Sequence, residues 1–189
     1  MFCRAKSTNL TAQQVAAGYM YSNSPYSGLL MYMLGATGGD PLGFYRFGVA
    51  GAVSSVAYSS GVWADWCGRG SSNTVFDVNV GGTVTTGPTT STVWANSSDI
   101  VIGARRIPGV DSPLTGSAAC VAMWDVLLTD DDVAQLTAGF SPRRVRPQSL
   151  VFYAPLVREL VVPRSLVNPI VALAAVASPT VTDHPRSYG

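Results

Sequence analysis

The sequence predicts an all-β protein, an antiparallel β-sandwich with one short helix and an extended C-terminal arm. Three observations carry this prediction. Over about the first 120 residues, apolar residues fall in short runs, many of them alternating with polar ones; Gly, Ser and Thr recur between the runs; and helical periodicity is almost absent. Many short strands joined by regular turns are typical of sandwiches.

Strands are expected wherever such an apolar run lies between turn signals. The runs cover residues 29–34, 42–49, 52–58, 74–80, 83–86, 100–103, 117–128 and 150–153. In the second run, Phe44 and Tyr45 fall on opposite faces, as the period of two in a strand requires. Gly81 and Gly82 predict a tight hairpin between residues 74–80 and 83–86.

One helix is well marked after the longest strand. Thr129 is a suitable N-cap, and residues 130–132 place three Asp in the first turn, where the helix dipole favours negative charge. Val133 and Leu136 form an apolar edge, and Gly139 ends the helix. A calcium site is the other interpretation of the three acids, but the dipole accounts for them fully.

Seven of the twelve prolines lie between Pro142 and Pro185. Proline lacks the backbone donor that a central strand needs, so the last part of the chain does not suit a sheet. We therefore expect one domain over residues 8–156 and a proline-rich arm over residues 157–189, with an apolar middle at residues 166–177. Such an arm cannot form its own core and must lie on the domain or on a partner.

The composition indicates a protein with partners. Only 12% of the 189 residues are charged and 47% are hydrophobic, while the net charge is +1; an average soluble protein has about 25% charged residues. A net charge this small produces no strong electrostatic field that would attract nucleic acid. The most apolar stretch, residues 170–177, is shorter than the roughly 20 residues of a membrane span. No apolar signal segment follows the first residues, so neither nucleic acid, membrane nor signal-directed secretion is expected.

The cysteines and the single histidine argue against a metal site. Cys3, Cys67 and Cys120 are odd in number and have no paired spacing, and His184 is the only histidine. A zinc site needs three or four nitrogen or sulfur ligands. We expect three reduced thiols, no metal and no cofactor.

Two segments resemble a known family. Residues 102–105 read Ile-Gly-Ala-Arg, Gly116 follows, and residues 123–131 read Met-Trp-Asp-Val-Leu-Leu-Thr-Asp-Asp. This pattern resembles the closing segment of concanavalin A-like, laminin-G-like jelly-roll domains. The resemblance extends over residues 100–156 and implies a concanavalin A-like β-sandwich (jelly roll).

The continuation resembles a subset of that family encoded by tailed bacteriophages. It comprises Gly-Phe-Ser-Pro at 139–142, Val-Arg-Pro at 145–147, Leu-Val-Phe-Tyr-Ala-Pro-Leu at 150–156 and Asp-His-Pro-Arg at 183–186. The resemblance implies a structural protein of the virion that decorates or cements the capsid through oligomer and arm contacts. Its partners would be the major capsid protein or other virion proteins, and we expect a homo-oligomer.

Glycoside hydrolysis, which some members of the superfamily perform, is not expected. Retaining hydrolysis needs two carboxylates about 5–5.5 Å apart, and related glucanases carry them as Glu-x-Asp-x-x-Glu along one strand. The only glutamate here is Glu159, in the arm, and residues 77–79 supply a single carboxylate. We expect no enzymatic activity.

Carbohydrate binding is the alternative function that the resemblance implies, as an adhesin that binds a cell-surface glycan from the virion surface or a fibre. Trp63 and Trp66 would form the aromatic platform, and Asp77 and Asn79 the polar part of the site. The competing interpretation is that tryptophans in a sandwich of this size belong to the core.

Arginine usage suggests a protein interface, because eleven of the twelve basic residues are Arg and the planar guanidinium is favoured at interfaces. The candidate partner-binding residues are Arg143, Arg144, Arg146, Arg158, Arg164, Leu166 and Ile170. Alternatively, these arginines solvate a loop or pair with the acids at 130–132.

Overall fold

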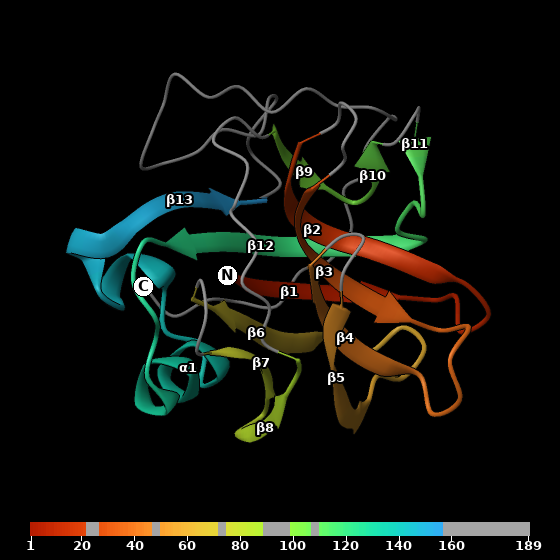
Figure 1. The fold of residues 1–189 in the computed structure, drawn as a ribbon, viewed down its shortest axis with the longest axis horizontal. Coiled ribbons are helices and arrows are strands. Elements are labelled where there is room, and N and C mark those ends of the chain that lie inside the picture. Colours follow the sequence, from red (N-terminus) through yellow and green to blue (C-terminus); the bar gives the residue numbers. More distant parts are fainter. Residues whose placement is uncertain (22–26, 47–49, 72–74, 89–98, 107–109, 157–189) are drawn as a thin grey trace.

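The computed structural model describes residues 1–21, 27–46, 50–71, 75–88, 99–106 and 110–156. Two antiparallel sheets pack face to face, which confirms the predicted β-sandwich (Figure 1). The first sheet has the order β13 (Leu150–Pro155), β12 (Gly116–Trp124), β1 (Phe2–Ser7), β6 (Ala64–Gly70), β7 (Phe76–Val80), β8 (Thr83–Thr86). The second has the order β5 (Ala50–Ala57), β4 (Pro41–Arg46), β3 (Ser27–Leu34), β2 (Gln13–Tyr21), β9 (Asp99–Ile102).

The smaller elements lie around this sandwich. They are a short strand pair, β10 (Arg105–Arg106) with β11 (Val110–Asp111), one α-helix, α1 (Asp130–Thr137), and two 3-10 turns, η1 (Pro142–Arg144) and η2 (Pro147–Ser149). Within the part of the chain that the structure describes, no helix has the length and apolarity to cross a membrane.

The core between the sheets follows from strand alternation. Phe76, Val78 and Val80 of β7 all point into it and are buried, as their period of two predicts. Phe44 of β4 stacks on Phe76 across the sheets, with ring centroids 4.9 Å apart. This contact joins the two layers.

The sandwich begins earlier than the expected boundary at residue 8, because β1 is a central strand of the first sheet. Phe2 lies opposite Ala122 of β12 on one side and Cys67 of β6 on the other. Arg4 points outward and forms an ion pair with Asp65 on β6. The charged residues of β1 therefore lie on its outward face, where Arg4 is paired across the sheet, and they are compatible with a central strand.

The helix is capped as its sequence predicts. The Thr129 Oγ1 accepts a hydrogen bond from the Asp132 backbone N–H, and the Asp132 carboxylate accepts from the Thr129 backbone N–H at 2.8 Å. Val133 and Leu136 cover Phe2 and Cys67 on the outward face of the first sheet. In the described residues, no group of three or more His, Cys, Asp or Glu side chains could hold a metal ion.

The longest predicted strand is shorter than expected. β12 ends at Trp124, and the residues that follow turn away from the sheet. Leu128 is then buried under α1 rather than within the sheet. The predicted arm, residues 157–189, lies outside the described residues.

The three cysteines are free thiols in the structure. Burial raises the pKa of the Cys120 thiol to about 12, and burial also raises the pKa values of Cys3 and Cys67. An exposed thiol has a pKa near 8.5, and only the thiolate is nucleophilic. We expect iodoacetamide at pH 8 to leave the folded protein unmodified for minutes and to add three groups after denaturation, as read by intact mass. Rapid labelling of the folded protein or a disulfide-linked mass would contradict this.

Asp132 links helix stability to pH. Burial alone would raise the pKa of this carboxyl, but hydrogen bonds from Thr129 and the ion pair with Arg146 lower it below its ordinary value. The stabilisation is therefore complete above pH of about 4 and is lost as the pH falls through the lowered pKa. We expect Asp132→Asn to lower the free energy of unfolding by about 1 kcal/mol at pH 7.

Urea unfolding at several pH values measures this effect, and the difference from wild type should shrink as the pH falls through the lowered pKa of Asp132. Asp131→Asn is the matched control, because the neighbouring Asp131 is exposed in the same helical turn. An equal loss in both variants would show that the helix dipole, rather than the capping contacts, is responsible.

Candidate functional site

A cavity of about 360 Å³ lies between the two sheets, at the end of the sandwich where α1 packs. This size is within the range of ligand-binding clefts. Its floor consists of the buried side chains Phe44, Met123 and Phe152. Leu29 and Ile100 line it from the second sheet. The described lining is thus mostly apolar.

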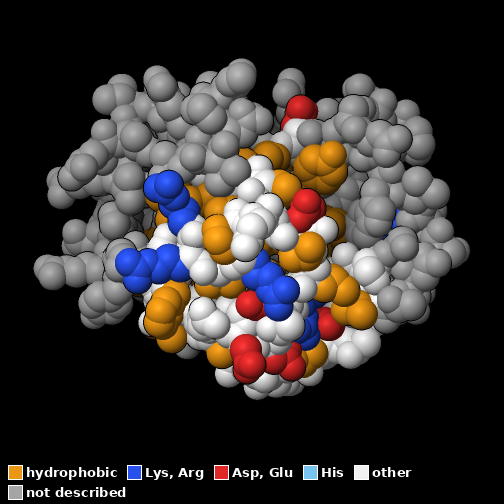
Figure 2. Space-filling model, turned by 90° about the vertical axis from the view of Figure 1, so that its left-hand side faces the viewer, with side chains coloured by type: hydrophobic (Ala, Val, Ile, Leu, Met, Phe, Trp, Pro, Cys, Tyr) orange, Lys and Arg blue, Asp and Glu red, His pale blue; other side chains and the backbone are white. Residues whose placement is uncertain are grey.

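The mouth of the cavity carries exposed apolar side chains. Val126 and Leu127 follow β12 and are 41% and 40% exposed, and Val151 on β13 is 50% exposed. Figure 2 shows this end of the molecule, where hydrophobic side chains reach the surface among basic and acidic ones. We call Val126, Leu127 and Val151 the apolar rim.

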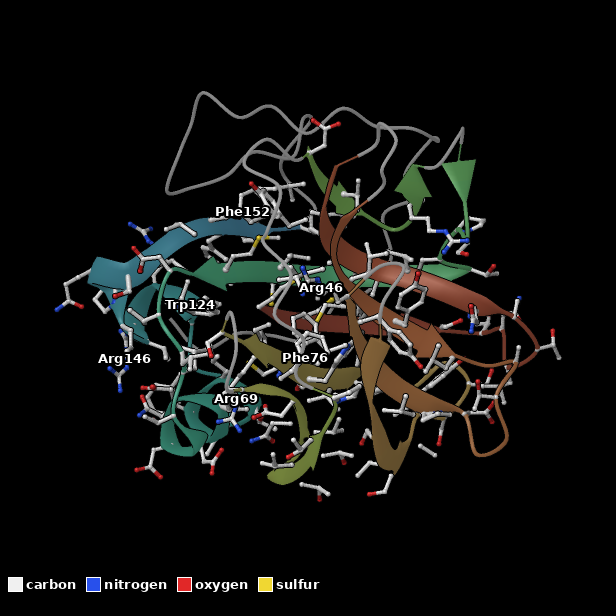
Figure 3. The ribbon with its side chains drawn as sticks, viewed as in Figure 1. Arg46, Arg69, Phe76, Trp124, Arg146 and Phe152 are labelled. Carbon is white, nitrogen blue, oxygen red and sulfur yellow. The ribbon has the colours of Figure 1, made fainter. Side chains whose placement is uncertain are left out.

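Trp124 is held in a fixed orientation beside the rim. Its indole N–H donates to the Val145 carbonyl at 2.8 Å, which attaches the end of β12 to the segment after α1. Arg69, Trp124 and Phe152 lie at the same end of the sandwich in Figure 3. The tryptophan therefore serves as a rigid wall rather than as a mobile side chain.

Arg69 has the charged side chain of the described lining, and two carboxylates already neutralise its charge. Its guanidinium binds the Asp77 carboxylate through Nε at 2.7 Å and through Nη2 at 3.2 Å. Its Nη1 donates to Asp130 at 2.7 Å and to the Leu128 carbonyl at 3.2 Å. Burial opposes its charge, but the hydrogen bonds to the two carboxylates raise the pKa of Arg69. It is consequently a structural cation, not a free anion-binding group.

The four predicted sugar-binding residues are not brought together. Trp66 lies between the sheets and is 1% exposed. Asp77 and Asn79 point to the opposite side of the first sheet, where Asn79 accepts a hydrogen bond from the Gly82 N–H. Trp63 lies before β6, and the Lys6 ammonium is 4.9 Å from the centroid of its ring.

The predicted arginines divide into two groups. Arg143 and Arg144 are exposed on η1. Arg146 forms an ion pair with Asp132 at 2.8 Å, which is the alternative that the sequence left open. The other candidates lie outside the described residues; they are Arg158, Arg164, Leu166 and Ile170.

Sequence reasoning missed the cavity. It placed residues 117–128 in one strand, which gives Val126 and Leu127 the pattern of ordinary strand residues. The structure ends β12 at Trp124, and the two side chains become exposed. A usable signal was present, since three apolar residues stand in a row between Asp125 and the helix cap.

Comparisons with known proteins give a fold but no family. No family model matches the sequence, and no curated protein matches it. A solved structure, that of a provisionally assigned carbohydrate-binding protein from Bacteroides ovatus, superposes with a TM-score of 0.64 at 15% identity. The match covers 89% of this chain and 49% of the other, so this chain spans about half of that protein's length. The likeness agrees with the fold seen here, a sandwich of two antiparallel β-sheets.

Proposed function

We propose that this chain is a non-catalytic binding domain that holds a protein partner at the apolar rim of its cavity, as a structural component of a bacteriophage particle. The observation that carries the proposal is the exposure of Val126, Leu127 and Val151 around an apolar cavity. The described lining residues include no carboxylate, and a glycosidase needs two.

Burial of the apolar rim by a protein partner would contribute favourable free energy to binding. Full burial of a Val or Leu side chain contributes about 1.5–3 kcal/mol, so covering the exposed halves of three such side chains contributes about 2–4 kcal/mol. Arg143 and Arg144, exposed on η1 near the cavity end, suit the polar margin of such an interface.

The virion role rests on the sequence resemblance. The segments over residues 100–156 resemble jelly-roll domains encoded by tailed phages, and the low charge suits a protein that is covered in an assembly. The domain would decorate or cement the capsid, with major capsid protein or further copies of itself as partners.

Carbohydrate binding is the second candidate, favoured by the fold shared with the provisionally assigned carbohydrate-binding protein and by Tyr19 and Trp124 in the cavity. Sugar hydroxyls need several hydrogen-bonding groups. The Arg69 guanidinium and the Trp124 N–H are already engaged, so among the described lining side chains Tyr19 is the remaining polar group. The cavity therefore suits an apolar partner better than a sugar.

A charge at the rim should abolish partner binding. Purified particles lacking the protein are mixed with wild-type or Val126→Asp chain, and bound copies are counted after sedimentation. We expect Val126→Asp to weaken binding at least tenfold, because an unpaired carboxylate would be buried at the contact. Cryo-electron microscopy then locates the wild-type copies on the particle.

Val62→Asp is the matched control, because Val62 is also an exposed valine, 56% exposed, in the loop before β6 and away from the cavity lining. It should bind like wild type. Binding by Val126→Asp as tight as that of wild type would show that the apolar rim is not the binding surface. Failure of the wild-type chain to bind any particle would contradict the virion role.

A glycan array and a hydrolysis assay test the second candidate and the absence of catalysis. We expect no selective glycan signal and no release of reducing sugar from β-glucans or galactans. Selective binding that Tyr19→Phe reduces would favour the carbohydrate function. Turnover of such a glycan by the wild-type chain would show an enzyme.

A further inference from the structure

The outward face of the second sheet carries a cluster of buried apolar side chains. Val15, Leu30 and Leu34 are 0%, 0% and 1% exposed, and Tyr32 is 5% exposed, although all four point away from the first sheet. Val101 of β9 packs against them. We call these five residues, with Tyr45 and Val53, the outer cluster; it touches all five strands of the sheet.

This pattern differs from a two-layer sandwich, in which outward side chains face water and are polar. β3 is apolar on both faces: Met31 and Met33 enter the core between the sheets, while Leu30, Tyr32 and Leu34 enter the outer cluster. A strand that is apolar on both faces is typical of a sheet covered on both sides. The second sheet therefore requires a third layer.

Tyr45 lies along the outer face, over two glycines of the second sheet. Its ring lies against Gly43 and Gly51, where an added Cβ would come within 2.7 and 2.4 Å of ring atoms. It meets Tyr32 edge to face, with centroids 5.2 Å apart. Burial raises the pKa of the Tyr45 hydroxyl, which agrees with a covered surface.

The described elements provide only part of a cover. β10 lies against β2 and β9, and Arg105 donates to the Tyr32 hydroxyl at 3.1 Å. The described helices are elsewhere: α1 contacts β6, and η1 contacts β13, both in the first sheet. A two-residue strand pair cannot shield a cluster that extends from β9 to β5.

We propose that the C-terminal segment of the same chain, residues 157–189, covers the outer cluster, with its apolar middle at residues 166–177 packed on Leu30 and Tyr32. The proposal concerns a different surface from the cavity and does not depend on the function proposed for it.

The chain leaves the sandwich at the β13 edge, from which it can reach the outer face of the second sheet. β5 faces β7 and β8, β4 faces β6 and β7, and β1 faces β2, so the β13 edge of the first sheet lies on the same side as the β9 edge of the second. Sheets pack about 10 Å apart and an extended residue spans about 3.3 Å, so a few residues after Leu156 suffice to pass around β9.

Among the segments that the structure does not describe, residues 157–189 also have the composition best suited to cover an apolar face. Residues 157–189 contain three Leu, one Ile and seven Val. Residues 89–98 contain one Val, one Trp and one Ala among Thr, Ser and Asn, and the other segments are three to five residues long. The outer cluster and the arm's apolar middle therefore complement each other in size and polarity.

Photo-crosslinking tests the proposal on the full chain. Benzoylphenylalanine replaces Val53, a half-buried member of the outer cluster, in an equal mixture of unlabelled and 15N-labelled protein. We expect crosslinked peptides from residues 157–189 that carry the same isotope as Val53's own chain. The control replaces Val84, which is 40% exposed on β8 of the first sheet, and should give no such peptide.

Crosslinks to residues 89–98, mixed-isotope crosslinks from another copy, or no crosslink to the arm would each overturn the proposal. A second measurement avoids the bulky probe. Leu173→Asp should increase binding of the dye ANS at least severalfold by uncovering the outer cluster, while Thr180→Asp, outside the apolar middle, should not. Unchanged dye binding by Leu173→Asp would also overturn it.

Discussion

The Arg69 guanidinium ties together the parts that form the cavity. It binds Asp77 on the neighbouring strand, Asp130 in the first turn of α1 and the Leu128 carbonyl in between. Because Arg69 and Asp77 are both largely buried, losing either partner would leave a charge unpaired away from water, which costs about 3–5 kcal/mol. The helix, the turn before it and the apolar rim are positioned against the sheet by this one cation.

A consequence is that the acids around 130–132 have separate tasks. Asp130 binds Arg69 and so connects the helix to the first sheet. Asp132 caps its own helix through Thr129 and binds Arg146 in the loop that follows. The helix dipole explains why three acids are tolerated at this helix end, but Asp130 and Asp132 each also bind an arginine outside the helix. The rigidity of the cavity wall follows from these contacts rather than from helix propensity.

Local signals made much of the fold predictable. Alternation placed Phe76, Val78 and Val80 in the core, and the capping residues marked α1 correctly. β1, β2 and β6 were missed. In β1 and β6 the outward charges, such as Arg4 and Asp65, find partners only across the sheet. The site was less predictable, because it depends on where β12 ends. A single sequence does not show that β12 ends at Trp124 or that the indole N–H of Trp124 binds the Val145 carbonyl.

The central position of β1 also constrains how the chain acquires its structure. Phe2 pairs with Ala122 and Ser7 with Gly116, residues that follow them by more than half the length of the chain. Such distant pairings raise contact order and slow folding. During synthesis β1 can pair with β6 early, but the edge that pairs with β12 stays unpaired until β12 has left the ribosome, and an unpaired strand edge is prone to aggregation. Chaperone dependence, or folding only after release, is the expected cost of this topology.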